Sequence, residues 1–440
     1  MIYDKAINNT PKEDVFMEKK NSPYREILKE KGYRALLIST MINRFGDALD
    51  AVAFTWLVYQ VTHSGSWSAI IFGLNVFPNV IVQPFAGAIV EKKDKKKIIV
   101  ATHILRGLLL TLFLIVFLSG NVNGWIMALF TLMVTSIEAF NMPAGTAFIP
   151  RVIKKENLTH GMSLNTMMSG VTTFIGTGLA GVLIAAAGIK TVMIIDIATF
   201  FIAAVIIMTI KVENPKEEQP KAEPYMHVLK EGFRYIKGAP VIINFCIIAV
   251  MLNMILVPIN SLQAPLVSEC YHADSSLLSI IGMAGSIGAI IGSFVLPFIK
   301  KRLSIKKMII CFGTLLGLSI TILPFAGGLT ENTMIKSIFA ATCFLIMTFC
   351  ASLITGAINI DFISNVDERY LARSSAVFTS VATAAIPVTS MLVGLIKIHI
   401  NTSTLISTCG LLTMVFSMII LLLNPALNME KGKTNAAETV

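Results

Sequence analysis

Long apolar runs recur along the whole chain and are separated by short polar segments. A helix that crosses the hydrocarbon core of a bilayer needs about 20 mostly apolar residues. Runs of that kind lie at residues 35–60, 67–90, 98–118, 124–149, 162–187, 190–210, 241–266, 276–299, 307–328, 334–359, 374–397 and 403–423. The pattern therefore predicts an all-α membrane protein with twelve transmembrane helices.

The longest polar segment divides these spans into two sets of six. The loops KKENLTHGMS and VDERYLARSS, after the fourth and tenth spans, share position and charge, which indicates two pseudo-symmetric halves, as is typical of secondary transporters. In the linker, MHVLKEGFRYI has helical spacing and is expected to lie along the membrane surface. The predicted parts are an N-terminal segment 1–34, a six-helix bundle 35–210, a linker 211–240, a second six-helix bundle 241–423 and a tail 424–440.

The distribution of a net charge of +10 predicts the topology. One side of the predicted membrane carries the loops EKKDKKK, PRVIKKENLTH, KKRLSIKK and SNVDERYLARS, and the other side carries only Lys190, Lys336 and Lys397. Because cytoplasmic loops are enriched in Lys and Arg, the basic side, with both termini, is expected in the cytoplasm. We expect a multi-pass protein of the cell (inner) membrane, with no nucleic-acid partner.

The first predicted span is unusual because NRFGDALD, residues 43–50, carries Arg44, Asp47 and Asp50. Each charge at the bilayer centre costs about 2.5–3.5 kcal/mol, which the apolar residues of the span barely balance, so these side chains cannot face lipid. The charges belong to one helical stripe with spacings of three and four, made of Thr40, Asn43, Arg44, Asp47, Asp50 and Phe54. The stripe is expected to face the protein interior or water.

The three charges of this span do not balance. Arg44 can pair with Asp47, because i and i+3 side chains meet on a helix. One arginine cannot neutralise two aspartates, so at least one carboxylate needs another counter-ion, a bound cation or a proton. A carboxylate withdrawn from water in this way is a candidate proton carrier. The sequence leaves open which of Asp47 and Asp50 carries the proton, and whether Arg44 only anchors the helix.

Three further charged residues, Arg106, Glu138 and Asp196, lie inside predicted spans. Glu138 is near the middle of the fourth span and is the second candidate for proton or substrate coupling. The alternative is that it is a satisfied polar group at a kink made by Pro143. Arg106 and Asp196 are candidate counter-ions, either for the first span or for each other.

The spans of the second half are nearly free of charge. Spans 7 and 10 instead carry amides and methionines, including Asn253, Asn260, Gln263, Met251 and Met347. Methionine adapts its shape and amides form hydrogen bonds, so such a surface suits large apolar ligands. The alternative is ordinary helix packing.

Motifs of several other protein classes are absent from the sequence. Without a GxxxxGK[ST] phosphate-binding loop, ATP is not the expected energy source. Without an HExxH or GxSxG motif, or a polar cluster at one membrane face, the sequence does not predict an enzyme or a receptor. The six cysteines have neither CxxC spacing nor a His partner at ligand spacing, and we expect no metal and no cofactor.

Residues 87–96, GAIVEKKDKK, occupy the basic loop after the second span. They match the motif Gly-x-x-x-Asp-Arg/Lys-x-Gly-Arg-Lys/Arg, with Glu91 in place of Asp and Asp94 in place of Gly. This loop motif and the twelve spans in two halves resemble those of the major facilitator superfamily. The resemblance implies the fold of that family. In the family the loop latches the inward-closed state, so the resemblance implies a gating role for Gly87, Glu91, Lys92, Lys95 and Lys96.

Further segments are similar, in the same order, to the macrolide-efflux type of drug:proton antiporter: Gly46-Asp47, FNMPAGTAFIPRVIKKENL, IIDIATFFIAA, LKEGFRYI and IPVTSMLVG. The resemblance implies export of amphipathic, often cationic drugs, including antibiotics, in exchange for protons by alternating access. It also implies a cavity lined by spans 1, 4, 7 and 10, with Asp47, Asp50 and Glu138 facing it and Arg106 and Asp196 as supports. The Gly-Pro-x-x-Gly-Gly motif of span 5 is represented by GTGLAG, without its proline.

Within transport, the alternative is an exporter of an endogenous product such as a siderophore, a peptide antibiotic or a lysolipid. Composition does not separate these substrates. We expect a monomer whose partners are the small-molecule substrate, protons and the lipid bilayer.

Overall fold

The computed structural model describes residues 27–211, 225–329, 331–367 and 370–423. These residues form helices joined by short loops, without a strand. The N-terminal residues 1–26, most of the predicted linker (212–224) and the tail 424–440 lie outside the described residues. The longer helices are α2 (Lys31–Thr62), α3 (Gly65–Lys92), α4 (Lys95–Leu118), α5 (Gly124–Phe148), α6 (Leu158–Thr209), α7 (Tyr225–Lys237), α8 (Pro240–Ser261), α10 (Ser275–Lys300), α11 (Ile305–Ile322), α13 (Thr333–Asn365), α14 (Leu371–Ile396) and α15 (Thr402–Leu423). Short turns are η1 (Ile149–Arg151), η2 (Lys155–Asn157), α9 (Gln263–Pro265), η3 (Leu266–Cys270), η4 (Leu323–Phe325) and α12 (Ala326–Leu329).

Among the described residues, ten helices are long and apolar enough to cross a membrane by length and composition. One of them, α6, contains two spans, because Gly188 adopts φ 78° and ψ 164°, a conformation that glycine adopts readily and other residues do not. α2 is also long enough to span, and its charged residues 43–50 keep it out of the ten. The twelve spans predicted from the sequence are therefore confirmed.

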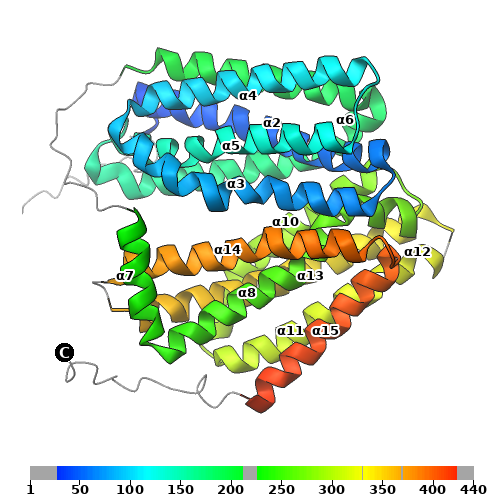
Figure 1. The fold of residues 1–440 in the computed structure, drawn as a ribbon. Coiled ribbons are helices and arrows are strands. Elements are labelled where there is room, and N and C mark those ends of the chain that lie inside the picture. The colour runs from blue at the N-terminus through cyan, green and yellow to red at the C-terminus, as the bar shows by residue number, and fades with distance from the viewer. Residues whose placement is uncertain (1–26, 212–224, 330, 368–369, 424–440) are drawn as a thin grey trace, which may run out of the picture.

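The helices form two bundles that lie side by side (Figure 1). The first bundle contains α2 to α6, uppermost in that view. The second bundle contains α8, α10, α11, α13, α14 and α15. Two helix pairs, α3 with α14 and α6 with α10, connect the bundles. This is the predicted arrangement of two six-helix bundles.

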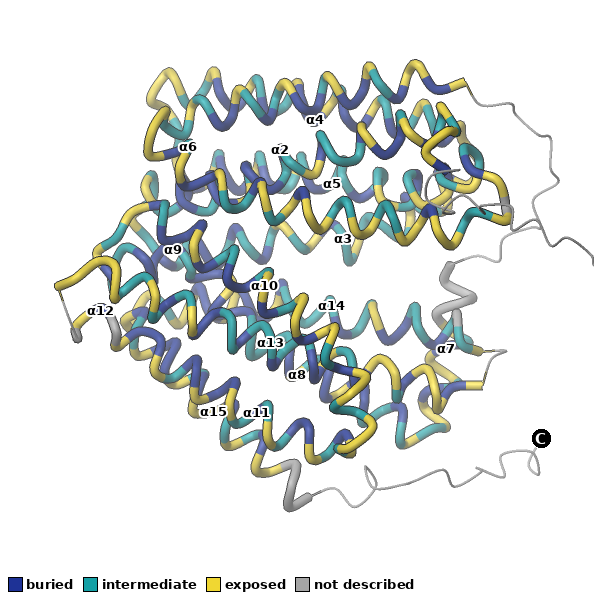
Figure 2. Tube along the Cα trace, turned by 180° about the vertical axis from the view of Figure 1, so that it is seen from behind, coloured by how far each residue is buried: buried dark blue, intermediate teal, exposed yellow. Residues whose placement is uncertain are grey.

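The outer faces of both bundles are apolar and exposed (Figure 2). On α4, Leu105, Leu108, Leu112 and Ile115 repeat at helical spacing and are 48% to 60% exposed. Phe294 on α10 is 73% exposed. Contiguous apolar surface of this extent is unfavourable in water and is covered by lipid tails in a membrane. These faces therefore lie in the bilayer.

The bundles touch each other at one end of the molecule, called here the closed end. The Ser390 hydroxyl on α14 donates a hydrogen bond to the Ala69 carbonyl on α3 at 2.5 Å. The backbone N–H of Gly181 on α6 donates to the Ser279 hydroxyl on α10 at 2.6 Å. A Cβ added to Gly181 would lie 2.8 Å from the Cα of Ser276, so only glycine allows this approach.

A carboxylate ties three more elements together at the closed end. Glu269, in η3, accepts hydrogen bonds from Tyr59 of α2 at 3.1 Å and from Thr402 of α15 at 2.6 Å. Its Oε2 also pairs with Lys397, at 3.4 Å. Because Tyr59 belongs to the first bundle and the other residues to the second, this network crosses the boundary between the bundles.

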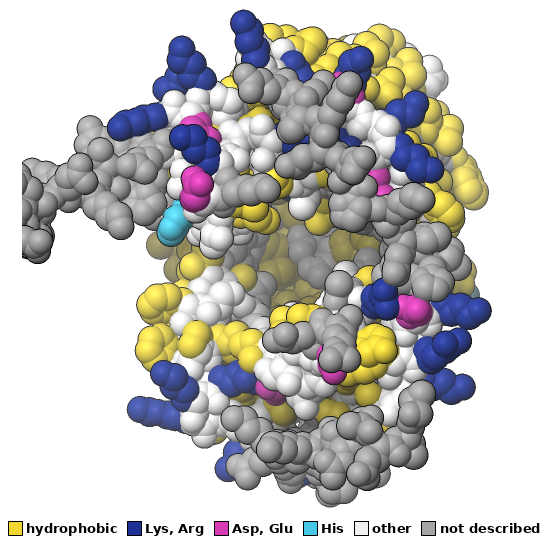
Figure 3. All heavy atoms as spheres, turned by 90° about the vertical axis from the view of Figure 1, so that its left-hand side faces the viewer, with side chains coloured by type: hydrophobic (Ala, Val, Ile, Leu, Met, Phe, Trp, Pro, Cys, Tyr) yellow, Lys and Arg dark blue, Asp and Glu magenta, His cyan; other side chains and the backbone are white. Residues whose placement is uncertain are grey.

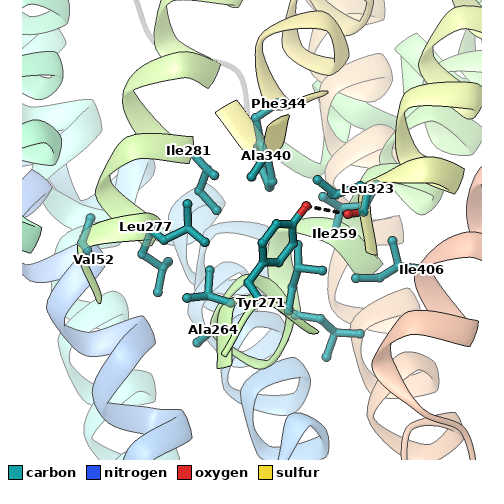
Figure 4. Packing of buried hydrophobic residues seen from close by; sticks show 14 of the residues in the cluster. Val52, Ile259, Ala264, Tyr271, Leu277, Ile281, Leu323, Ala340, Phe344 and Ile406 are labelled. Carbon is teal, nitrogen blue, oxygen red and sulfur yellow. Dashed lines mark hydrogen bonds between the residues drawn. The ribbon is translucent and has the colours of Figure 1, made fainter. Parts of the chain in front are cut away.

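An apolar cluster fills the space beside this network (Figure 4). Tyr271 lies at its centre and donates its hydroxyl to the Leu323 carbonyl at 2.5 Å. The cluster joins Val52 of α2 to Leu277 of α10 and Ile406 of α15. Burial of side chains from both bundles in one cluster seals the closed end.

The opposite end, called here the basic end, is hollow. Figure 3 looks at this end and shows a recess between the two bundles with Lys and Arg side chains around it. α7, the predicted surface helix, lies across this end in Figure 1. It is held on α14 by an ion pair between Glu231 and Arg373 and by stacking of Tyr235 on Tyr370, with ring centres 4.6 Å apart.

Gly46 allows α2 to lie directly on α6, and replacing it tests that contact. A Cβ at Gly46 would overlap Thr199 Oγ1 and Asp196 Oδ1. We expect Gly46→Ala to destabilise the protein by about 1–3 kcal/mol or more through overpacking. Gly170→Ala is the matched control, because a Cβ there meets nothing within 4 Å. Melting temperatures in detergent that fall equally for both variants would contradict this packing.

Candidate functional site

The charged residues predicted inside the first bundle converge on Arg106 of α4. Its Nη2 lies 3.0 Å from Asp47 Oδ1 on α2 and 3.7 Å from Glu138 Oε2 on α5. Its Cζ lies 4.4 Å from the ring centre of Phe200 on α6, a cation–π contact. The Arg106 side chain is 8% exposed, Asp47 18% and Glu138 38%. Arg106 thus connects four helices. Solvent exposure within the cluster increases from the Arg106 guanidinium to the Glu138 carboxylate.

Asp47 takes its counter-ion from α4 and not from its own helix. Its second oxygen, Oδ2, accepts a hydrogen bond from Asn43 Nδ2 at 2.8 Å. Arg44 is exposed and forms no ion pair with Asp47 in the described part of the chain. Both carboxylate oxygens of Asp47 are already engaged, Oδ1 by Arg106 and Oδ2 by Asn43. The pairing of Arg44 with Asp47 that the sequence allowed is therefore not the one observed.

Asp196, on α6, is the most deeply buried of the predicted charges, at 1% exposed. Thr199, one turn further along, donates its hydroxyl to Asp196 Oδ1 at 3.2 Å. The charge of Asp196 interacts with those of Asp50, Asp47 and Arg106, but no ion pair is formed with it among the described residues. Arg106 is therefore the counter-ion of the first span, and Asp196 lies beside Gly46 of α2.

Negative charge exceeds positive charge in this cluster. Asp50 interacts electrostatically with Asp47, Arg106 and Glu138, yet its carboxylate has no hydrogen-bond partner in the described part of the chain. Buried polar atoms also stay unpartnered there: Asn43 Oδ1, His103 Nδ1 and Arg106 Nε and Nη1. One guanidinium among four carboxylates leaves a formal excess of negative charge that protons and a cation can neutralise.

The second bundle contains an uncharged cavity of about 430 Å³ between α8, α10 and α13. Of the amides and methionines predicted to meet a ligand, Asn260, Gln263 and Met347 line it. Asn253 instead donates to the Ala382 carbonyl at 3.1 Å, and Met251 is exposed. Apolar walls with a few amide and hydroxyl groups are typical of sites for drug-sized molecules.

The basic loop between α3 and α4 is anchored to the first bundle. Lys95 Nζ donates to the Glu91 carbonyl at 2.6 Å. Lys96 Nζ donates to two carbonyls at the end of α6, Met208 and Ile210, at 2.8 Å each. The side chains of two other predicted gating residues, Glu91 and Lys92, are exposed. A Cβ on Gly87 would meet nothing within 4 Å.

Sequence reasoning missed two residues of the cluster, Thr199 and Phe200. Both follow Asp196 at helical spacing, at i+3 and i+4, so the sequence already placed them on the same face of span 6 as Asp196. Glu269 was not identified from the sequence either. Its partners Tyr59, Lys397 and Thr402 are far away in the sequence, and no local pattern identifies them.

Comparison with known proteins identifies relatives over most of the chain. The family described as the Major Facilitator Superfamily matches residues 36–390. Macrolide efflux protein A of Streptococcus pyogenes is 21% identical over 386 residues, which is 87% of this chain and 93% of that protein. The multidrug efflux pump Tap of Mycolicibacterium fortuitum is 21% identical over 66% of this chain and 72% of Tap. The staphyloferrin A transporter of Staphylococcus aureus is 21% identical over 64% of this chain and 71% of that transporter.

Solved structures share the fold at low sequence identity. The nucleoside transporter NupG superposes with a TM-score of 0.71 at 13% identity, over 91% of this chain and 99% of NupG. A bacterial homologue of the iron transporter ferroportin in an inward-facing state superposes with a TM-score of 0.66 at 15% identity, over 89% of this chain and 97% of that one. At such identities the likeness concerns the fold.

The central position of Arg106 predicts unequal effects of removing the two arginines. Arg106→Gln leaves Asp47 and Glu138 without their cation, so we expect a loss of about 3–5 kcal/mol in stability. Arg44→Gln removes an exposed side chain and is expected to change stability by about 0.5 kcal/mol or less. Thermal unfolding of the purified variants in detergent measures both. If Arg44→Gln lowers the melting temperature as much as Arg106→Gln, the assignment of the counter-ion is wrong.

Proposed function

Since this chain belongs to the major facilitator superfamily, and so is a multi-pass membrane transporter and not an enzyme, we propose that it exports amphipathic, cationic small molecules in exchange for protons. The observation that carries the proposal is the excess of carboxylates around Arg106, graded from buried Asp196 to partly exposed Glu138. The relatives named as macrolide and multidrug efflux pumps support the direction of transport and the substrate class.

Protons and substrate compete for the same carboxylates in this proposal. When Asp47, Asp50 or Glu138 is ionised, the cluster attracts the cationic group of a substrate. When protons from the outer side occupy these groups, the attraction is lost and the substrate leaves. Arg106 keeps Asp47 in place throughout, and it lowers the net negative charge that protons and the substrate cation must neutralise.

The second bundle supplies the complementary half of the site. The uncharged cavity near Met347 takes the apolar body of the substrate, and Asn260 and Gln263 offer hydrogen bonds to its oxygen atoms. A charge on one side and an apolar surface on the other select amphipathic cations. Because the two surfaces belong to different bundles, a bound substrate touches both parts that move during alternating access.

The form described here is the one that loads substrate. The recess opens at the basic end, which the positive-inside rule assigns to the cytoplasm together with both termini, so we infer that this is the inward-open form in the cell membrane. Export then requires the network around Glu269 and the Ser390 contact to separate at the closed end. The loop residues Gly87, Glu91, Lys92, Lys95 and Lys96 would latch the basic end once it closes. No partner subunit is needed for this cycle, and we propose that a monomer carries it out.

Arg44 favours a second candidate function. Its exposed guanidinium lies one turn from Asp47 and pairs with no acid in the described part of the chain. A substrate with an anionic group as well as a cationic one, such as a siderophore, a peptide antibiotic or a lysolipid, would use it. The relative named as a staphyloferrin A transporter supports export of an endogenous product of this kind.

Transport into inverted membrane vesicles tests the proposal. With an acidic interior, we expect uptake of a macrolide or a cationic dye, and about tenfold slower uptake by Asp50→Asn and by Glu138→Gln, because each loses a group that exchanges proton for cation. Glu331→Gln is the matched control, since the same chemical change is made on an exposed loop residue.

If both carboxamide variants take up substrate as fast as the unmutated chain at every imposed pH gradient, the coupling site is wrong. Uptake of a carboxylate siderophore or a lysolipid, but of neither macrolide nor dye, would favour the second candidate. In that case Arg44→Gln is expected to abolish uptake, whereas it is expected to leave uptake of a cationic dye nearly unchanged.

A further inference from the structure

A second cavity, at the basic end of the first bundle, gathers positive charge. It has a volume of about 550 Å³ and lies between the start of α4, the turn η1 and the end of α6. Lys96, Arg151 and Lys211 line it. We propose that this cavity binds the phosphate head of an anionic phospholipid from the leaflet on the basic side.

The three cations of this cavity outnumber its single carboxylate, Asp94. None of the three forms an ion pair among the described residues. Arg151 also interacts electrostatically with Lys95. Asp94 is the one carboxylate among the lining residues, and it is committed to α4: its Oδ1 accepts the backbone N–H groups of Lys96 and Lys97 at the first turn. Like charges held together repel one another, and an anion bound between them removes that repulsion.

Hydrogen-bond donors remain available for such an anion. A lysine ammonium has three N–H bonds, and Lys96 uses two of them on the carbonyls of Met208 and Ile210. Arg151 has five donors and forms no hydrogen bond through its side chain in the described part of the chain. Guanidinium groups bind phosphate through two parallel hydrogen bonds, which makes Arg151 the principal phosphate ligand.

The surface beside the cavity explains why the ligand is a lipid. Along α6, Ile202, Val205 and Met208 follow one another at spacings of three residues and are each about half exposed. Met208 also lines the cavity, so this apolar surface is continuous with the cavity that holds the cations. A molecule with an anionic head and apolar chains contacts both surfaces, whereas a soluble phosphate contacts only the first.

Binding there has a structural consequence. Lys96 lies in the first turn of α4, Arg151 in η1 and Lys211 two residues after the end of α6, so one phosphate would tie three parts of the first bundle together. Basic pockets on the cytoplasmic side of membrane proteins hold anionic head groups in this way. The bound lipid would therefore stabilise the start of α4 on its own bundle. This inference does not depend on which substrate the protein exports.

Lipid titration of the purified full-length protein tests the inference. With native mass spectrometry and thermal unfolding as readouts, we expect phosphatidylglycerol to raise the melting temperature and to bind about tenfold more tightly than phosphatidylcholine. Inorganic phosphate is expected to leave the melting temperature unchanged. Equal binding of the two lipids would overturn the proposal, and so would inorganic phosphate that displaces phosphatidylglycerol, which would assign the cavity to a soluble phosphate compound.

Two variants locate the binding to this cavity. Arg151→Gln and Lys211→Gln are each expected to weaken phosphatidylglycerol binding about fivefold, with the melting temperature in lipid-free detergent unchanged. Lys301→Gln removes an exposed lysine at the same end of the second bundle and should bind the lipid as the unmutated protein does. An equal loss of affinity in Lys301→Gln, or none in Arg151→Gln and Lys211→Gln, would show that the lipid does not bind here.

Discussion

The rest of the structure depends on one constraint, that a charge placed in the membrane must find its partner inside the protein. Arg106 meets it by pairing with Asp47 on α2, approaching Glu138 on α5 and lying over Phe200 on α6. The ion pairs replace solvation that lipid cannot supply, and so they bring four helices to one point. One guanidinium serves several carboxylates and does not neutralise all of them, and we propose that the remaining negative charge binds protons and substrate.

The two bundles are chemically unlike although they share an architecture. The first holds the charge cluster, and the second holds an uncharged cavity of about 430 Å³ with amide and hydroxyl groups. They are fastened together at the closed end, through Glu269 and Ser390, and stand apart at the basic end. In the proposed cycle, contacts at the closed end separate and a rigid-body motion exposes the proposed site to the other side of the membrane.

The features that could be predicted from the sequence are those that depend on a single helix and not on contacts between helices. Apolar run lengths placed the spans, and the insertion cost of Arg44, Asp47 and Asp50 showed that span 1 faces inward. The pairing of Asp47 with Arg106 was one of several open choices, because residues 59 positions apart meet only through helix packing. The same holds for Tyr59 and Glu269, and for the cations of the second cavity, whose proximity follows from how α4, η1 and α6 end. Gly188, with φ 78° and ψ 164°, makes the turn between the two predicted spans that α6 contains.

The central claim is that protons and a cationic substrate occupy the same carboxylates of the first bundle. Its most direct test is proton release on substrate binding, measured with a pH indicator in weakly buffered detergent solution as a macrolide or cationic dye is added to the purified protein. We expect substrate binding to release protons near neutral pH, and the release to shrink at alkaline pH, where the carboxylates are already ionised. Substrate binding without any proton release from pH 5 to pH 9 would contradict it.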